Sequence, residues 1–338
     1  MTVEVPGRVN LIGEHIDYLG YPVLPMAITR RLRLDFEPLD GAEIRIESGH
    51  YGARQFAWTD EIERWPAGDF GNYVKAAAQA VGKRWGIGRG FAGRVTSSIP
   101  AAAGLSSSSA LVIAAAIALL RLRGAEPGFA ELMEVLPEGE MYVGTRGGGM
   151  DHAVCLAGRA GCAVRVGFRP VKVTPVPIPE GWAFFAAHSL QRAEKSGAAR
   201  EEYNKRRALA EAGDCHALRH ALSEAQRVED AMDALRGDDI EGFGEILNAS
   251  HRSLRDDLKV SCERADRLVE SCVAAGALGA RIMGAGFGGY VLGLCRSGEI
   301  EETVAKIDRC HFLRLAERAH FPDYLMRVEP GDGALVAR

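Results

Sequence analysis

The segment at positions 100–111 places small residues, a glycine and four hydroxyl side chains in front of an apolar stretch. Small residues and Gly104 let a backbone approach a ligand closely. A helix is predicted from Ala110, and a helix N-terminus offers unpaired N–H groups and partial positive charge. We therefore expect phosphate groups to bind here and a serine hydroxyl to be able to ligate Mg²⁺. The residues concerned are Gly104, Leu105, Ser106, Ser107, Ser108 and Ser109.

Two other interpretations of this segment fit less well. A simple serine N-cap on a core helix needs only one serine, and the segment has four. The Walker phosphate-loop pattern is absent, so the segment is not a Walker loop.

A second cluster, at positions 6–18, gathers charged side chains around Gly13: Arg8, Glu14, His15 and Asp17. Carboxylates and an imidazole this close together suit the recognition of several sugar hydroxyls, because each carboxylate oxygen accepts hydrogen bonds. Arg8 suits a phosphate group or an ionised catalytic partner. The alternative is a solvated surface turn, but the flanks at 9–12 and 22–27 are apolar and favour the edge of a core.

Two further clusters are rich in glycine. Asp151 comes just after Gly147–Gly149, where flexible backbone can bring its carboxylate against a ligand as a general base or metal ligand. The alternative is a glycine turn with a helix-capping aspartate.

Positions 284–289 match GxGxxG, but the residues at 290–294 predict a strand and not a helix. A dinucleotide site is therefore excluded there, and a tight hairpin or a glycine loop near a nucleotide remains.

The elements that must position these clusters are strands and helices without regular βαβ alternation. This arrangement predicts an α+β protein in two lobes. The proline-rich stretch 170–179 is the predicted crossing between them. Strands are predicted at 32–36, 43–46, 93–99, 161–166 and 182–188, and helices at 73–85, 110–122, 192–212 and onward to about 274.

Composition narrows the function class. The chain has 338 residues, of which 47% are hydrophobic and 25% charged, as in folded globular proteins. Lys plus Arg number 41 and Asp plus Glu 45, a net charge of −4, and nucleic-acid binders normally carry a basic excess. No apolar run is long enough for a membrane span, and positions 1–6 do not look like a secretory signal. We therefore expect a cytoplasmic protein without nucleic-acid or membrane partners.

Seven cysteines occur, an odd number without any CxxC spacing. This pattern argues against a disulfide framework or a zinc site and favours free thiols in a reducing compartment.

Taken together, the clusters resemble the galactokinase family of the GHMP kinase superfamily. Positions 6–18 resemble the galactokinase signature, 104–110 the phosphate loop of the superfamily, and 281–289 its third motif. A stretch at 250–262 is also similar to galactokinases. The resemblance implies the two-lobed GHMP kinase fold: an N-terminal lobe of mixed sheet and helices at 1–170, a C-terminal lobe of antiparallel sheet and helices at 171–338, and an active site in the cleft between them.

The resemblance also implies an ATP- and Mg²⁺-dependent kinase that phosphorylates the anomeric hydroxyl of galactose or a close galacto-configured sugar. Asp151 would take the proton of that hydroxyl, and Arg8 would keep the carboxylate ionised and stabilise the transferring phosphoryl group. ATP would lie along 104–109, and Mg²⁺ between Ser108 and Glu140. The sugar would contact Glu14, His15, Asp17, Gly149 and Tyr203.

Departures from the family pattern concern the choice of sugar. The chain has Ile16 and Leu19 where galactokinases commonly have Thr and Asn, and His152 replaces the usual glutamine. The run at 147–151 is similar to the branch of N-acetylgalactosamine kinases and fungal galactokinases, whereas Tyr203 favours galactose. The chain begins just before the first motif, without the longer N-terminal segment of many galactokinases, so we expect closure over the substrate to differ.

Several alternatives remain open. The chain could be an N-acetylgalactosamine kinase, or a regulator that binds sugar and ATP without turnover. A glycosidase pairing Glu14 or Glu140 with Asp151 would need no phosphate loop. Mevalonate and homoserine kinases keep the serine loop but generally lack a segment like that at 13–18. As partners we expect only the sugar and ATP, with the chain a monomer or weak homodimer.

Overall fold

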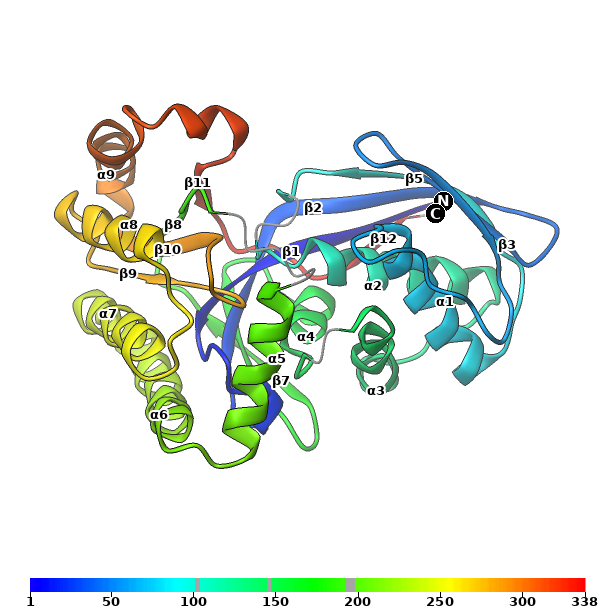
Figure 1. Ribbon diagram of the computed structural model, residues 1–338, viewed down its shortest axis with the longest axis horizontal. Coiled ribbons are helices and arrows are strands. Elements are labelled where there is room, and N and C mark those ends of the chain that lie inside the picture. The colour runs from blue at the N-terminus through cyan, green and yellow to red at the C-terminus, as the bar shows by residue number, and fades with distance from the viewer. Residues whose placement is uncertain (101–103, 145–146, 192–197, 338) are drawn as a thin grey trace.

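The computed structural model describes residues 1–100, 104–144, 147–191 and 198–337 (Figure 1). Its first sheet has six strands in the order β12-β1-β2-β5-β3-β4. Neighbouring strands are antiparallel except β3 and β5, which are parallel. The bounds are β1 Thr2–Ile12, β2 Leu24–Pro38, β3 Glu43–Ser48, β4 Gly52–Ala57, β5 Phe91–Ser97 and β12 Leu335–Ala337.

Four helices accompany this sheet: α1 (Gly71–Trp85), α2 (Ser107–Leu122), α3 (Phe129–Glu140) and α4 (Met150–Ala157). Helix α2 contacts the other three helices as well as β1 and β2. Its residues are apolar on nearly all faces, and most of them are buried, as a helix in the middle of a domain requires. The sequence predicted the central position of α2. This position fixes where the N-terminus of the helix lies.

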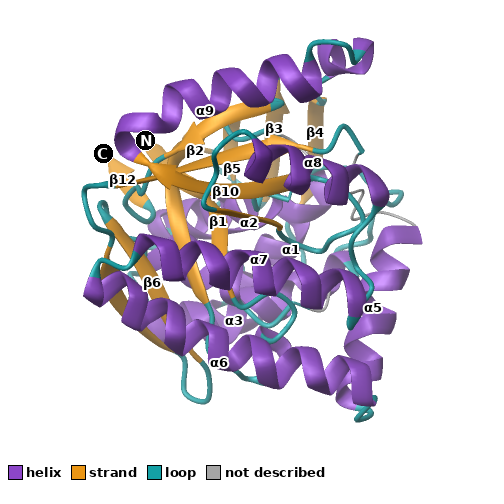
Figure 2. Cartoon of the chain, turned by 90° about the vertical axis from the view of Figure 1, so that its left-hand side faces the viewer, coloured by secondary structure: helices purple, strands orange, loops and turns teal. Residues whose placement is uncertain are grey.

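The second sheet is antiparallel, in the order β11-β8-β10-β9. Figure 1 shows it on the left, with helices α7 and α8 beside β9, and Figure 2 shows α6 and α7 lying along each other beneath the strands. The predicted two-lobed α+β architecture is confirmed. The bounds are β8 Trp182–His188, β9 Gly279–Ile282, β10 Tyr290–Arg296, β11 Leu325–Val328, α5 Ala198–Glu211, α6 Cys215–Gly237, α7 Ile240–Asp256, α8 Glu263–Ala274 and α9 Ile300–Ile307.

Some elements differ from the sequence prediction. Helix α2 begins at Ser107, three residues before the predicted start, so three of the four serines are helical. The stretch 170–179 is more than a crossing, because it contains β7 (Lys172–Pro177), which pairs with β6 (Cys162–Gly167). A two-stranded ribbon accepts prolines at edge positions, where no ladder N–H is needed. Of the helix predicted at 192–212, residues 192–197 lie outside the described residues.

The division at 170/171 stays a prediction. The β6–β7 hairpin spans it, and β12 returns from the end of the chain to the first sheet. Within the described ranges, the helices are all too short or too polar to cross a bilayer.

At Gly279, strand β9 packs so closely on α7 that no side chain fits between the two backbones. A Cβ added to Gly279 would overlap the backbone of Gly244 in α7. We expect Gly279→Ala to lower the free energy of unfolding by about 1–3 kcal/mol through overpacking, measured by urea denaturation. Gly181→Ala is the matched control, because a Cβ there meets nothing within 4 Å. Equal stability of the two variants would contradict this close packing.

Candidate active site

The N-terminus of α2 is not capped by its own serine. Ser106, at the N-cap, has left-handed backbone (φ 61°, ψ 33°), and its side chain makes no capping hydrogen bond. Its Oγ instead donates to Asp151 Oδ2 at 2.5 Å. The plain N-cap interpretation is therefore wrong, and the first turn of α2 keeps N–H groups that could bind an anion.

Asp151 is held by Arg8 from the opposite side. Arg8 is buried on β1 and donates from Nε and Nη2 to Asp151 Oδ1, both at 2.8 Å. Its Nη1 donates to the carbonyl oxygen of Gly104 at 2.5 Å. Burial opposes the charge of Arg8, but the carboxylates of Asp151 and Glu14 outweigh it and raise the pKa of Arg8. Strand β1, the loop before α2 and α4 thus meet at one carboxylate, whose side chain is still 17% exposed.

Asp17 lies next to this group. Its Oδ2 accepts the backbone N–H of Gly148 at 3.0 Å, and a Cβ on Gly148 would overlap Asp17, so glycine is required there. Gly149 follows with a φ of 100° and forms the N-cap of α4. Burial and the charge of Asp151 raise the pKa of Asp17 to about 6. The carboxylates of Asp17 and Asp151 are therefore close to each other, and that of Asp17 is easily protonated.

Glu14 and His15 contact the β9–β10 loop. Glu14 Oε1 accepts the N–H of Gly284 at 2.6 Å, and the buried Arg281 lies 3.3 Å from the same oxygen. His15 Nε2 is 3.2 Å from the carbonyl oxygen of Ala285. Burial, together with His220, lowers the pKa of His15 to about 3, so its imidazole is neutral. These contacts join the motif at 6–18 to the second sheet.

Helix α6 contacts the motif at 6–18 through Glu224, a residue outside the predicted site. This fully buried carboxylate accepts the N–H groups of Gly13 (3.0 Å) and Glu14 (3.3 Å). It also accepts the hydroxyl of Ser250 at 2.9 Å and pairs with Arg227 at 2.7 Å. Burial alone would raise the pKa of Glu224, but its charged and polar neighbours lower it to about 2.

Helix α5 covers the motif with an aromatic ring. The ring of Tyr203 lies 5.2 Å from that of His15 and 6.1 Å from that of Tyr18, measured between centroids. Burial and the charge of Asp17 raise the pKa of Tyr203 well above its ordinary value, so its hydroxyl stays protonated. The guanidinium of Arg207 lies over the ring of Tyr18, at 5.4 Å.

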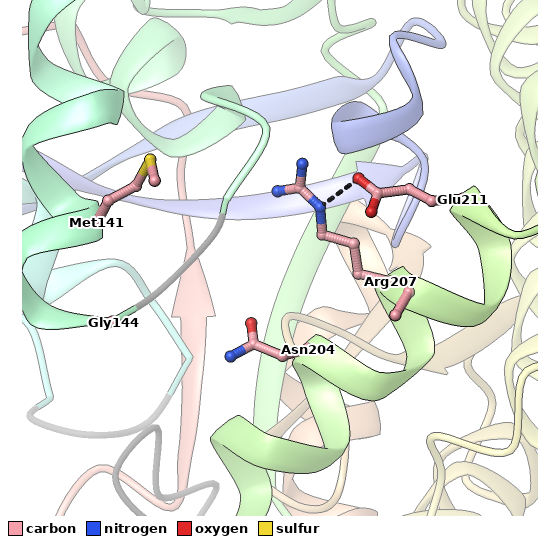
Figure 3. A pocket seen from close by; sticks show the side chains of 6 residues that line it. Met141, Gly144, Asn204, Arg207 and Glu211 are labelled. Carbon is pink, nitrogen blue, oxygen red and sulfur yellow. Dashed lines mark hydrogen bonds and ion pairs between the residues drawn. The ribbon is translucent and has the colours of Figure 1, made fainter.

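A pocket opens beside this ring cluster (Figure 3). Met141 and Gly144 lie on one side of it, and α5 supplies the other side with Asn204 and the ion pair between Arg207 and Glu211 (2.8 Å). The pocket is thus bounded by the turn that follows Glu140 and by the helix that carries Tyr203.

Glu140, at the end of α3, is buried and bonds to a serine of α2. The serine is Ser109, whose Oγ donates to Glu140 Oε1 at 2.6 Å. Ser108 lies in the same first turn and is half-buried. Hydroxyl and carboxylate oxygens are the donors that Mg²⁺ takes, so the residues present fit such an ion. The roles of Ser108 and Glu140 in binding it stay a prediction.

The structure thus brings most of the sequence-predicted residues together. Arg8, Gly104, Ser106 and Asp151 form one bonded group, and Asp17 and Gly149 adjoin it. Glu14, His15 and Tyr203 form a second group towards the other lobe. The alternative of a solvated surface turn at 6–18 is excluded, because Arg8, Glu14 and His15 are all buried.

Three protein-family models match the chain, and all three belong to the galactokinases or the wider GHMP kinases. The galactokinase galactose-binding signature matches residues 1–34, the N-terminal domain of the GHMP kinases matches 72–159, and their C-terminal domain matches 231–312.

Curated relatives and solved structures extend this match over most of the chain. A galactokinase of Chloroflexus aggregans is 33% identical over 89% of this chain and 85% of its own, and one of Mycobacterium tuberculosis is 34% identical over 90% and 93%. The crystal structure of Lactococcus lactis galactokinase complexed with galactose superimposes with a TM-score of 0.87 at 26% identity, covering 99% of this chain and 94% of that one. A mevalonate kinase structure, at 19% identity and a TM-score of 0.74 over 98% and 99%, shares the fold.

The raised pKa of Asp17 has a consequence for stability. Because its pKa of about 6 lies above the unfolded value of about 3.9, the protonated group stabilises the fold, and this contribution is lost as the pH rises from about 4 to 6. Asp17→Asn removes the titration. We expect the stability of the variant relative to the natural protein to increase between pH 4.5 and 7.5, by an amount on the order of 1 kcal/mol after allowance for partial exposure.

Urea denaturation of both proteins at the two pH values measures this change, and the difference between them cancels the other titrating groups. Asp40→Asn, at a fully exposed carboxylate, serves as the control. A relative stability that stays constant or decreases over this range would contradict the raised pKa.

The buried contacts of Glu224 predict a large effect of its removal. Glu224→Ala leaves two backbone N–H groups and the Arg227 guanidinium without their partner, so we expect a loss of about 3–5 kcal/mol in the free energy of unfolding. Glu229→Ala on the same helix removes a surface pair with Arg165 and should cost less than about 1 kcal/mol. Thermal and urea unfolding measure both, and similar losses would show that Glu224 is not a central support.

Proposed function

The chain belongs to the galactokinase family of the GHMP kinases, whose members use ATP, and we propose that it transfers the γ-phosphoryl group of ATP to the anomeric hydroxyl of galactose or a close galacto-configured sugar. The observation that carries the proposal is the position of Asp151. Its carboxylate is bonded both to Arg8 and to the serine at the N-terminus of α2. A proton acceptor and an anion-binding helix end are therefore adjacent.

Asp151 is the general base in this proposal. Its Oδ atoms receive the proton of the anomeric hydroxyl as that oxygen attacks the γ-phosphorus. Arg8 is fixed by three hydrogen bonds and keeps the carboxylate ionised. Its positive charge stabilises the phosphoryl group during transfer. The N–H groups of the first turn of α2 bind the phosphates along 104–109. Positioning and charge stabilisation supply most of the catalysis in phosphoryl transfer.

The remaining residues hold the sugar and the metal. We assign sugar contacts to Asp17 and to the backbone of Gly149, which adjoin Asp151, and to Glu14, His15 and Tyr203. The neutral imidazole of His15 can donate or accept a hydrogen bond, whereas ionised carboxylates only accept. Ser108 and Glu140 would hold Mg²⁺, which neutralises charge on the phosphates when bound.

The sugar itself is tested by ADP release against a panel: galactose, N-acetylgalactosamine, galacturonate, arabinose and glucose. Turnover with galactose above the others supports the proposal. Preference for N-acetylgalactosamine would assign the chain to that kinase branch. Binding of both ATP and galactose without ADP release would make the protein a regulator instead.

Asp151→Asn tests the mechanism. An amide cannot accept the proton as a carboxylate does, so we expect the rate of ADP release with galactose and ATP to fall by about 10²–10⁴-fold. The amide keeps the shape of the side chain but not its charge, so we expect a lower melting temperature because the buried Arg8 loses its counter-charge. Circular dichroism should show that the variant is still folded at the assay temperature. Asp233→Asn, at an exposed site on α6, should leave the rate unchanged. A near-natural rate in Asp151→Asn would rule out its role as the base.

A further inference from the structure

His152 is a buried imidazole with an unpartnered nitrogen. It follows Asp151 on α4, and its side chain is only 2% exposed. Its Nε2 makes no hydrogen bond within the part of the chain that the structure describes. A buried polar atom without a partner costs about 1–3 kcal/mol, so its presence calls for a partner that binds to it.

The group that Nε2 faces is the carboxylate of Glu140. The two atoms, His152 Nε2 and Glu140 Oε1, are 3.9 Å apart, which is too long for a hydrogen bond. Metal–nitrogen and metal–oxygen bonds are each about 2.0–2.2 Å long, so one cation can bridge a gap of this size. Ser109 donates to the same carboxylate oxygen and fixes its direction.

We propose that His152 is a nitrogen ligand in the divalent-cation site of Glu140, and that this site therefore favours Mn²⁺ or Co²⁺ over Mg²⁺. The inference rests on the proposed function only in taking Glu140 as a metal ligand. Imidazole suits first-row transition metals, whereas Mg²⁺ takes oxygen ligands and holds several waters. A nitrogen beside the carboxylate thus shifts the preference of the site.

The other ligands of such a cation must be oxygens of another kind. The described residues contain no group of three or more His, Cys, Asp or Glu side chains that could hold a metal. A serine hydroxyl at the start of α2, waters and the phosphates of a nucleotide can complete the coordination. The cation would therefore bind tightly only together with the nucleotide, which sets the conditions of the experiment.

Metal binding is measured in the absence of turnover, with a non-hydrolysable ATP analogue. The dissociation constants of Mn²⁺ and Mg²⁺ are determined by calorimetry for the natural protein and for His152→Gln, which keeps a hydrogen-bonding side chain but removes the imidazole. Because nucleotides themselves differ in affinity for the two ions, the readout is the change in their ratio. We expect His152→Gln to lower the preference for Mn²⁺ by roughly tenfold, and His216→Gln, at an exposed histidine, to leave it unchanged.

A second measurement needs no variant. Pulsed electron paramagnetic resonance of Mn²⁺ bound to the natural protein with the same analogue should show coupling to a ¹⁴N nucleus of an imidazole. Absence of that coupling, or an unchanged ratio of dissociation constants in a folded His152→Gln, would overturn the proposal. Neither readout involves a sugar, so failure to phosphorylate galactose would overturn the proposed function without deciding this one.

Discussion

The ion pair between Arg8 and Asp151 is the interaction on which the rest of the site depends. Removing a cation and a carboxylate from water is costly, and the cost is offset only when both are fully bonded. Here Arg8 directs two N–H groups at one carboxylate oxygen and a third at the carbonyl oxygen of Gly104, while Ser106 bonds to the other carboxylate oxygen. The strand, the loop and the two helices must therefore be in place together, because displacing any one of them leaves a buried charge exposed or unpaired.

A second set of buried charges ties the motif at 6–18 to the other lobe. Glu224 binds the backbone of Gly13 and Glu14 from α6, and Arg281 donates to the carbonyl oxygen of Leu11 from β9. The motif is thus held on one side by the sheet that carries Arg8 and on the other by elements beyond residue 200. Any movement between the lobes would act directly on Glu14 and His15, because both lie in the motif that begins in β1 and bond to Gly284 and Ala285 in the β9–β10 loop.

The sequence predicted the parts of the site that use local patterns, and missed those made by tertiary contact. The serine run before an apolar helix and the glycines before Asp151 are short-range signals, and the structure brings the two segments together. Ser106 bonds to Asp151 and does not cap α2. Its backbone is left-handed, and no local sequence pattern predicted that conformation. Glu224 did leave a signal, because it falls on the face of α6 formed by Ala217, Ala221 and Val228, an unusual place for a carboxylate. Three of its four partners, Gly13, Glu14 and Ser250, are far from it in the sequence, so its function could only be recognised in three dimensions.

Strand β12 pairs with β1, the strand that carries Arg8, with Val3 opposite Val336. During synthesis β1 leaves the ribosome first, and the strand that covers its free edge follows only after the whole second lobe. Until then, one row of backbone N–H and C=O groups on the strand of Arg8 stays open to other chains, as uncovered sheet edges do. The first sheet is therefore completed last, and its exposure to mispairing is set by how quickly the intervening lobe folds.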